Sequence, residues 1–314
     1  MIKLIWGVSM VTTVLNSVIS LFLIMLVGVY GSRKGIITQE LNVGLINVLI
    51  NILLPFMVIS SFTFTFGSSI KSNIGKGFYY SLATYVILIL ASYILLIPIK
   101  GDKKTIIHFS NVFSNTGYIG FPVLNAIYGP EGVVYGSIFN MFFVLFVWTY
   151  GLMLFKGHIE KDELRKEIIK TLLNPSIIAV IIGIAIITFN IEIPRILYNS
   201  INSGGSISGP LSMIILGAIV SKGKIRSSLG DWKLYYGLMV KMAVLPLILI
   251  LISLFTHRDI VTNSVIIIAS MPAATMTSIF AESFDKEKDF ASIMVLLTTL
   301  LSVITIPILV RILV

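Results

Sequence analysis

Apolar segments of about 20 residues, separated by short polar loops, occupy nearly the whole chain of 314 residues. A helix needs roughly 20 mostly apolar residues to cross a lipid bilayer. The pattern therefore predicts an all-α membrane protein with ten transmembrane helices. The expected spans are residues 11–30, 42–61, 77–97, 106–128, 132–155, 172–189, 196–221, 233–256, 261–283 and 290–313.

The composition favours a membrane protein over a globular enzyme with a large core. Charged residues make up 12% of the chain, whereas a soluble domain averages about 25%. The absence of cysteine excludes disulfides and thiolate sites for catalysis or metal binding. The sequence also has no glycine-rich phosphate loop, no nucleophile paired with a base and no histidine with partners at metal-ligand spacing. We expect no enzyme activity, no resident metal and no cofactor.

The basic residues predict how the chain lies in the membrane. They give a net charge of +9, but they lie in short loops between apolar segments, which argues against a nucleic-acid partner. The loops after odd-numbered segments hold 16 Lys and Arg residues, and the opposite side holds 6. Cytoplasmic loops carry the excess of Lys and Arg, so we expect a cell-membrane protein with both termini outside the cell. The first segment lacks a cleavage site and is expected to span the bilayer.

The ten expected spans divide into two sets of five. Residues 156–171 are strongly charged and are expected to form a solvated helical connector between residues 1–155 and residues 172–314. Because five is odd, the two halves cross the membrane in opposite directions and can be related as inverted repeats. The second and fourth segments of each half contain prolines in matching places: Pro55 and Pro122, then Pro210 and Pro272.

The fourth and ninth segments are expected to break at Pro122 and Pro272 and to cross near the middle of the bilayer. A proline inside a helix removes a backbone donor and clashes with the preceding turn. Matching broken helices are typical of the binding site of a transporter. A half-helix that begins at a break offers free N–H groups and a partial positive charge, which favours an anion such as a carboxylate. A half-helix that ends there offers carbonyl groups, which can coordinate a cation such as Na⁺ or accept from Asn side chains.

Polar and small residues surround both expected breaks. Asn111 and Asn115 lie four residues apart on one helical face, with Thr116 beside them and Gly120 just before the proline. Two amides so near a break favour a cavity-lining role, and the alternative is that they hydrogen-bond neighbouring helices together. In the ninth segment, hydroxyl residues including Thr275 follow the proline.

Lys241 is the only charged residue expected well inside a span. Its side chain either extends to the membrane interface or acts as a counter-charge near the crossing, where it would compensate half-helix C-termini or attract an anion. Asn140 in the fifth segment is a further candidate for the site. No Asp or Glu lies in the middle of any expected span, which argues against a proton antiporter.

Six motifs occur along the chain in the following order: Asn115-Thr-Gly-Tyr-Ile-Gly-Phe-Pro122, Tyr128-Gly-Pro-Glu-Gly132, Asn174-Pro-Ser-Ile-Ile-Ala179, Pro210-Leu-Ser-Met-Ile-Ile-Leu-Gly-Ala218, Pro272-Ala-Ala-Thr-Met-Thr-Ser-Ile-Phe-Ala281 and Thr305-Ile-Pro307. With these motifs the chain resembles the auxin efflux carrier family over nearly its whole length. The resemblance is to the bacterial branch, the permeases similar to malonate transporters, and distantly to the plant PIN-FORMED carriers.

The resemblance implies a fold of two inverted five-helix repeats in which the fourth and ninth helices cross. It implies a scaffold of helices 1, 2, 6 and 7, often dimeric, and a transport domain of helices 3–5 and 8–10. It also implies transport of organic anions, such as auxins and small dicarboxylates, by an elevator-like movement. Two departures stand out, because the long cytoplasmic loop of the plant carriers is absent and Phe121-Pro122 replaces their Asn-Pro. The second departure argues against auxin itself.

The resemblance further implies that Asn115, Asn140 and the backbone at Gly120–Pro122 and Met271–Ala273 bind the substrate, and that Lys241 corresponds to a lysine of the family's eighth helix. From the residues and the resemblance together, the expected substrate-binding residues are Asn111, Asn115, Thr116, Gly120, Pro122, Asn140, Lys241, Met271, Pro272, Ala273 and Thr275.

The expected function is secondary transport of a small organic anion, a mono- or dicarboxylate. Its partners would be the substrate, membrane lipid and a second copy of the chain. The alternatives within transport are a sodium-coupled symporter of the bile-acid type and a proton antiporter. From another class, the protein could be a membrane sensor that binds a ligand without moving it.

Overall fold

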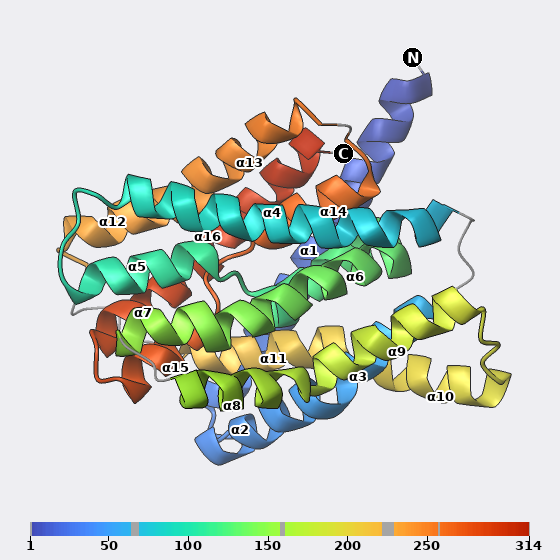
Figure 1. The fold of residues 1–314 in the computed structure, drawn as a ribbon, viewed down its shortest axis with the longest axis horizontal. Helices are drawn as coiled ribbons and strands as arrows, with labels where there is room; N and C mark the ends of the chain where they lie inside the picture. Colours follow the sequence, from blue (N-terminus) through green and yellow to red (C-terminus); the bar gives the residue numbers. More distant parts are fainter. Residues whose placement is uncertain (1, 64–68, 158–160, 222–228, 257, 314) are drawn as a thin grey trace.

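The computed structural model describes residues 2–63, 69–157, 161–221, 229–256 and 258–313, and the elements found there are all helices. Figure 1 shows that most of the long helices lie side by side along one direction. The prediction of an all-α chain is confirmed for these residues. The helices lettered α are conventional, and those lettered η are single wide turns of π-helix.

The helices follow the apolar segments closely. The first half contains α1 (Ile2–Arg33), α2 (Gln39–Val48), η1 (Leu49–Leu53), α3 (Leu54–Phe62), α4 (Ser69–Leu95), α5 (Asp102–Val112), η2 (Thr116–Gly120), α6 (Phe121–Phe146), η3 (Val147–Gly151) and α7 (Leu152–Lys156). The second half contains α8 (Lys161–Leu172), α9 (Pro175–Phe189), α10 (Arg195–Ser206), α11 (Ser208–Ser221), α12 (Trp232–Met239), η5 (Val240–Val244), α13 (Leu245–Ser253), α14 (Ile260–Ala269), α15 (Met276–Ser283) and α16 (Lys288–Leu313).

Among the described residues, six continuous helices are long and apolar enough to cross a membrane, or seven if the bent pair Leu164–Leu172 and Pro175–Phe189 forms one span. The number is below ten partly because the fourth and ninth segments are interrupted and count as shorter helices. In addition, one 41-residue stretch, Thr116–Lys156, joins parts of two expected spans across a bend at Gly129, where φ is 60°. The number of ten spans stays a prediction.

Three prolines follow π-turns instead of breaking their helices. Pro55, Pro122 and Pro246 each lie two residues after the last residue of a π-turn, in η1, η2 and η5 respectively. A proline ring clashes with the carbonyl group four residues earlier, and a wider turn moves that carbonyl away. The expectation of a break at Pro122 is therefore wrong, because η2 runs into α6 without interruption and Pro122 lies in the first turn of α6.

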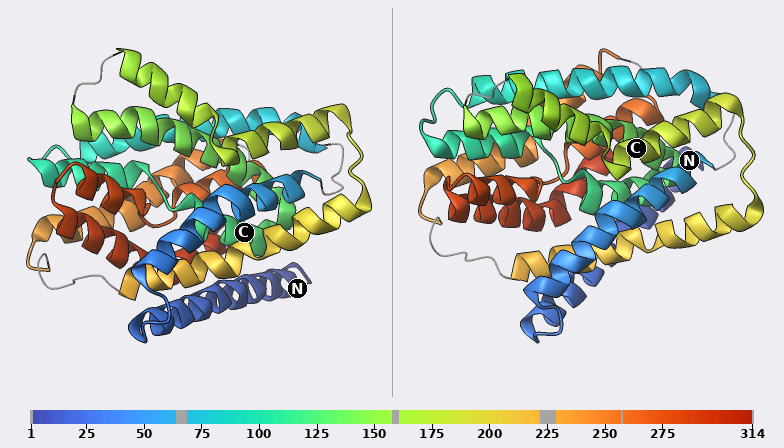
Figure 2. Two further views of the ribbon diagram at one scale, coloured as in Figure 1. Left: turned by 90° about the horizontal axis from the view of Figure 1, so that it is seen from below. Right: turned by 60° about the horizontal axis from the view of Figure 1, so that its bottom comes forward.

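The contacts between helices fall largely within two sets. In one set, α1 lies along α11, and α3 packs against α9 and α10. Figure 2 shows α1 beside the chain segment that contains α11. Glycines allow the close approach of these two helices, because a Cβ atom added at Gly28 or Gly217 would overlap the backbone of the opposite helix. In the other set, α4 packs against α5, α6 and α14, while α16 packs against α5 and α15.

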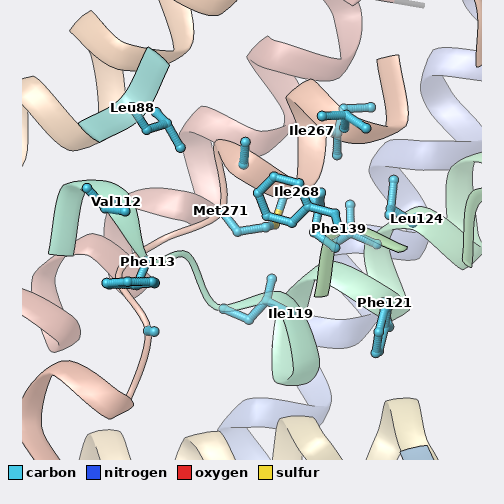
Figure 3. Packing of buried hydrophobic residues seen from close by; sticks show 14 of the residues in the cluster. Leu88, Val112, Phe113, Ile119, Phe121, Leu124, Phe139, Ile267, Ile268 and Met271 are labelled. Atoms are coloured by element: carbon cyan, nitrogen blue, oxygen red, sulfur yellow. The ribbon is translucent and has the colours of Figure 1, made fainter. Parts of the chain in front are cut away.

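Apolar side chains fill the space around the interrupted segments. Figure 3 shows Val112 and Phe113 from the fourth segment in the same cluster as Ile267, Ile268 and Met271 from the ninth. All five side chains are almost completely buried. The interruptions therefore lie inside the protein, where backbone polar groups without hydrogen-bond partners would be costly.

Candidate functional site

The two interruptions lie against each other and supply each other's hydrogen bonds. The first separates α5 from η2, and the second separates α14 from α15. The Asn115 backbone N–H donates to the Pro272 carbonyl at 2.8 Å, and the Ala274 N–H donates to the Phe113 carbonyl at 3.0 Å. These bonds form a short antiparallel bridge between Ser114 and Ala273. Two segments more than 150 residues apart in sequence are thus held side by side.

Asn115 caps the half-helix that begins after the first interruption. Its side-chain Oδ1 accepts from the Tyr118 N–H at 3.1 Å, which satisfies one of the free donors of the helix start. Its side-chain Nδ2 has no hydrogen-bond partner, although the residue is only 3% exposed. A buried amide donor without a partner is costly, and Nδ2 is left free to donate to a water molecule or a ligand.

A cavity of about 710 Å³ lies at this point. Both half-helices that begin at the interruptions open into it, η2 with Thr116 and Gly117 and α15 with Thr275 and Met276. The start of each helix carries a partial positive charge and free N–H groups. Among the described residues, the lining contains one acidic side chain, the exposed carboxylate of Glu282, and no Lys or Arg. Positive potential at the inner end therefore comes from backbone groups and amides.

A second amide lies beside the first. The Thr116 hydroxyl donates to Asn140 Oδ1 at 2.6 Å, and both residues line the cavity. This bond fixes the orientation of the Asn140 amide and leaves its NH₂ group as the end able to donate to a ligand. The remaining wall of the cavity is mostly apolar, from residues of α2, η1, α3, α6 and η3: Val43, Ile46, Ile50, Leu54, Phe143, Val144 and Val147.

Lys241 lies on the other side of the interruptions, at the ends of the preceding helices. Its Nζ donates to Ser114 Oγ at 2.7 Å and to the Asn111 carbonyl at 3.2 Å. The side chain is 1% exposed and is not part of the cavity lining. Of the two interpretations of the sequence, extension to the membrane interface is excluded by this burial. The ammonium compensates a helix C-terminus, and Ser114 separates it from the cavity.

The Asn111 side chain hydrogen-bonds a neighbouring helix and does not line the cavity. Its Nδ2 donates to Ser92 Oγ in α4 at 3.0 Å. The same hydroxyl bonds His108 Nδ1 at 2.8 Å, and His108 Nε2 bonds the Tyr150 hydroxyl at 2.6 Å. Asn111 therefore corresponds to the alternative interpretation, an amide that joins helices.

A second cavity, of about 520 Å³, lies beyond Pro122. It is lined by the end of α3, with Ser60 and Ser61, and by residues of α10 and α6. The first cavity, in contrast, is lined by Gln39 and Asn42 at the start of the same helical segment, Gln39–Phe62. The two cavities thus lie toward opposite ends of that segment, with the start of η2 and α6 between them.

Comparison with known proteins shows the family to which the chain belongs. Residues 13–310 match the model of a family described as "Membrane transport protein". The chain belongs to this family. It is the auxin efflux carrier family that the motifs resemble, so that prediction is confirmed. The chain is accordingly an integral membrane protein of a transporter family.

Two archaeal relatives are described as uncharacterized transporters. The one from Methanothermobacter thermautotrophicus is 29% identical over 198 residues, which are 62% of this chain and 63% of the relative. The one from Methanocaldococcus jannaschii is 24% identical over 308 residues, which are 93% of this chain and 96% of the relative. The match to the first relative thus covers less than two thirds of its length.

For this transporter-family chain, the expected binding residues separate into three groups. Those that line the first cavity are Asn115, Thr116, Asn140 and Thr275. Pro122 lines the second cavity. The others line neither cavity: Asn111, Gly120, Lys241, Met271, Pro272 and Ala273. The last two nevertheless hold the interruption in place, since the Pro272 carbonyl accepts from Asn115 and Ala273 pairs with Ser114.

Two cavity residues lie far from the expected breaks in the sequence. They are Asn42 in α2 and Asn174 before α9, and both line the first cavity. A polar residue in an apolar segment is the only sequence signal for Asn42, and Asn174 reads equally well as the N-cap that it is, accepting from the Ser176 N–H at 2.9 Å. Only the packing of helices brings these residues to one cavity.

Proposed function

We propose that the protein is a secondary transporter of small organic anions, carboxylates in particular. The observation that carries this proposal is the unpartnered, buried Asn115 amide at the start of a helix that opens into a cavity. A carboxylate there accepts from Asn115 Nδ2 and Asn140 Nδ2 and faces the positive ends of two half-helices. Hydrogen bonds to a charged group contribute about 1.5–3 kcal/mol each, and a helix start contributes about 0.3–1 kcal/mol.

The size and wall of the cavity support a small substrate. Ligand sites of about 300–1,000 Å³ hold small molecules, and the value of about 710 Å³ falls in that range. The exposed Glu282 carboxylate stands at the far end of α15, about 9 Å along the helix from its start at 1.5 Å per residue. At that distance, and in contact with water, its charge is screened and opposes binding at Asn115 only weakly.

We further propose an elevator-like movement of a transport domain, built from the third to fifth and eighth to tenth spans, against a scaffold of the first, second, sixth and seventh. In this arrangement ten spans form two inverted repeats whose broken helices cross at the interruptions, and the scaffold forms a homodimer. Two observations support the proposal. Helix contacts fall largely within these two sets, and each cavity is lined by residues from both of them.

One polar contact that such a movement must break lies between α11 and η2. The Ser212 hydroxyl in α11 donates to the Tyr118 carbonyl in η2 at 2.9 Å, between the two cavities. Beside it, Gly209 in α11 lies close to Pro122, and a Cβ atom at Gly209 would be 3.8 Å from the proline ring. One hydrogen bond is worth only about 0.5–1.5 kcal/mol net, so this polar contact opposes sliding only weakly.

The charged loops support an orientation in the cell membrane with both termini outside. With that orientation, the first cavity faces the cytoplasm, because it is lined by Gln39, Asn174 and Glu282 near the ends of expected cytoplasmic loops. The second cavity then faces the outside. Movement of the site from one to the other would carry the anion across the membrane.

The test is exchange of labelled carboxylates by purified protein in liposomes. We expect counterflow of at least one mono- or dicarboxylate, reduced roughly 10- to 100-fold by Asn115→Ala, since one charged hydrogen bond is lost. Asn51→Ala is the matched control, because Asn51 is exposed and its amide bonds the Asn47 carbonyl of its own helix at 2.9 Å. Saturable binding of a carboxylate without exchange would contradict the transporter proposal and favour a membrane sensor. The absence of both binding and exchange would refute the proposed organic-anion site.

A further inference from the structure

The first cavity changes in chemical character from its inner end to its mouth. The inner end lies beside the paired interruptions, where Asn115 and Asn140 offer amide donors. Helix α15 leads from there toward the mouth, since it begins at Met276, two residues after the backbone that pairs with the first interruption, and ends at Ser283. The residues of α15 in the lining therefore show which groups a bound molecule meets at increasing distance from the interruptions.

Apolar side chains follow the donors. Met276 and Ile279 lie about one turn apart on α15, and both line the cavity. Phe143 and Val147, from α6 and η3, belong to the same lining. These side chains carry no charge and no strong hydrogen-bonding group. This part of the cavity therefore favours the apolar body of a bound molecule and disfavours a charged group, which would lose its water there.

Hydrogen-bond acceptors lie nearer the mouth. Glu282 lines the cavity about 9 Å along α15 from its start, at 1.5 Å per residue. Its carboxylate is exposed, and none of the ion pairs between described residues involves it. Asn42, near the start of α2, also lines the cavity and is 8% exposed, and its Oδ1 has no hydrogen-bond partner. The mouth thus offers one negative charge and an unpartnered acceptor.

No basic side chain of the described lining balances these acceptors. A molecule with a carboxylate at each end would bring its second carboxylate toward Glu282, and like charges brought together oppose binding. A molecule with an ammonium group at that end would instead form a charge-assisted hydrogen bond with Glu282. Donors at the inner end and acceptors at the mouth are complementary to a molecule of the opposite polarity, with an apolar part between its two ends.

We propose that the first cavity takes a monocarboxylate with an apolar chain and a hydrogen-bond donor at its far end, above all an ω-amino carboxylate, and that Glu282 selects against dicarboxylates. This inference rests on the proposed function, because Asn115 and Asn140 hold the carboxylate end. It adds the chemistry of the opposite end. A neutral far end leaves the Glu282 carboxylate in water, so this residue changes the preference among carboxylates without being needed to bind them.

The first experiment measures the Kd of caproate, ε-aminocaproate and adipate, three acids of one chain length, by titration calorimetry of the purified protein at neutral pH. We expect ε-aminocaproate to bind roughly five-fold more tightly than caproate, as a partly exposed ion pair allows. Adipate should bind roughly ten-fold more weakly than caproate, because its second carboxylate meets Glu282. Adipate that binds as tightly as caproate, or ε-aminocaproate that binds no more tightly, would overturn the proposal.

Glu282→Gln tests whether Glu282 makes this selection. The change keeps the size of the side chain and removes its charge. We expect the Kd values of ε-aminocaproate and adipate to come within about two-fold of that of caproate, whose own Kd should stay the same. Caproate thus reports whether the variant is folded, and an unchanged order of the three acids in a folded variant would contradict the role of Glu282.

Glu192→Gln is the matched control. It removes an exposed carboxylate between α9 and α10, which lines neither cavity, and it should leave all three Kd values unchanged. A shift in this variant as large as that in Glu282→Gln would show that the net charge of the protein, and not the cavity, sets the preference. If Glu282→Gln does not fold, the order of the three Kd values in the unaltered protein still decides the proposal.

Counterflow in liposomes separates this inference from the proposed function. Labelled ε-aminocaproate and adipate are suited to this assay, because both are charged at neutral pH and cross lipid slowly without a carrier. Exchange of adipate in preference to ε-aminocaproate would refute the inference and leave the organic-anion transporter in place. Preferential binding of ε-aminocaproate without its exchange would support the inference and contradict transport. If none of the three acids binds, the inference fails, and the exchange of other carboxylates decides the proposed function.

Discussion

The two sides of the paired interruptions differ in charge, in access to solvent and in whether a side chain fills the space beside the helix ends. On one side, helices begin, their N–H groups and the Asn115 amide face a cavity, and the donor is left without a partner. On the other side, helices end, and the buried Lys241 ammonium fills the space between their carbonyl groups. The polarity of the helix makes the two sides opposite. The chain supplies a partner on the acceptor side and leaves the donor side open, so the donor side is where we propose that the ligand binds.

The largest expected effect comes from reversing the charge of the open side. Asn115→Asp keeps the oxygen that caps Tyr118 N–H but replaces the amide donor by a negative charge. We expect exchange of carboxylates to fall on the order of 100-fold or more, because two like charges placed together cost several kcal/mol. Thermal stability should be unchanged or higher, since Asp is an equally good N-cap.

The measurement for this prediction is counterflow together with Tm of the purified variant. Asn199→Asp, at an exposed position in α10, serves as the control for an added charge. Unchanged transport by Asn115→Asp would remove the distinction between the two sides.

The next largest effect should follow from removing the Ser114 hydroxyl, which lies between the two sides. Ser114 lines the cavity and also accepts from Lys241, so Ser114→Ala removes a buried acceptor of the ammonium. We expect a loss of about 1–3 kcal/mol in stability, read as a lower Tm, because a buried donor loses its partner. Ser110→Ala is the matched control, since Ser110 bonds only the Ile106 carbonyl of its own helix. Equal Tm values for the two variants would contradict the role of Ser114.

A smaller effect is expected from the close packing between η2 and α14. A Cβ atom at Gly120 would lie 2.9 Å from Ile268 Cγ1, whereas one at Gly117 would lie 3.4 Å from Leu54 Cδ1. Overpacking typically costs about 1–3 kcal/mol of stability. Because the Ile268 side chain can shift, we expect the loss of stability in Gly120→Ala to be near the lower limit. Gly117→Ala should be close to neutral in Tm. A reversed order would show that the interruption is looser than described.

The smallest effect is expected at an ion pair far from the interruptions, where lysine has an acidic partner. Lys103 Nζ lies 2.9 Å from Asp231 Oδ2, and this hydrogen bond lowers the pKa of Asp231 and raises that of Lys103. The pair stabilises the fold at neutral pH by less than about 1 kcal/mol, as a partly exposed pair.

The pH dependence of that ion pair follows from the directions of the two pKa shifts. The contribution of Asp231 is present above its ordinary pKa of 3.8 and is lost as the pH falls through the lowered value, while that of Lys103 is lost only as the pH rises through a value above 10.5. Asp231→Asn, which keeps the N-cap, should therefore lower Tm slightly at pH 7 and by less at pH 3. A drop as large as that of Ser114→Ala would contradict the contrast between paired and unpaired lysines.

The amount that sequence alone could predict differs between elements. Apolar length identified the helical segments, because spanning a bilayer demands it. The interruption at Pro272 was found, since that proline lies between α14 and α15. The interruption of the fourth segment was misplaced from Phe113–Asn115 to Pro122, because a π-turn accommodates the proline and an Asn cap starts the new helix earlier. A polar residue that can cap is as strong a signal for a helix start as a proline.

The candidate site was predicted only in part for a related reason. Asn115 and Thr116 lie next to the interruption, so local sequence identified them. Asn111 and Lys241 have the residue types of a binding site, but hydrogen bonds to other helices turn them away from the cavity. Asn42 and Asn174 reach the cavity through tertiary packing alone. Residue type indicates which groups need partners, whereas packing decides which ones face a ligand.

The absence of cysteine permits a direct test of where the anion binds. A single cysteine introduced at Ser278, which lines the first cavity, is exposed to a membrane-impermeant maleimide from each side of the membrane in turn. We expect modification from the cytoplasmic side, slowed by the carboxylate that the protein exchanges, and no slowing when Asn115→Asp is present. Modification at the same rate with and without that carboxylate would show that the anion does not occupy this cavity.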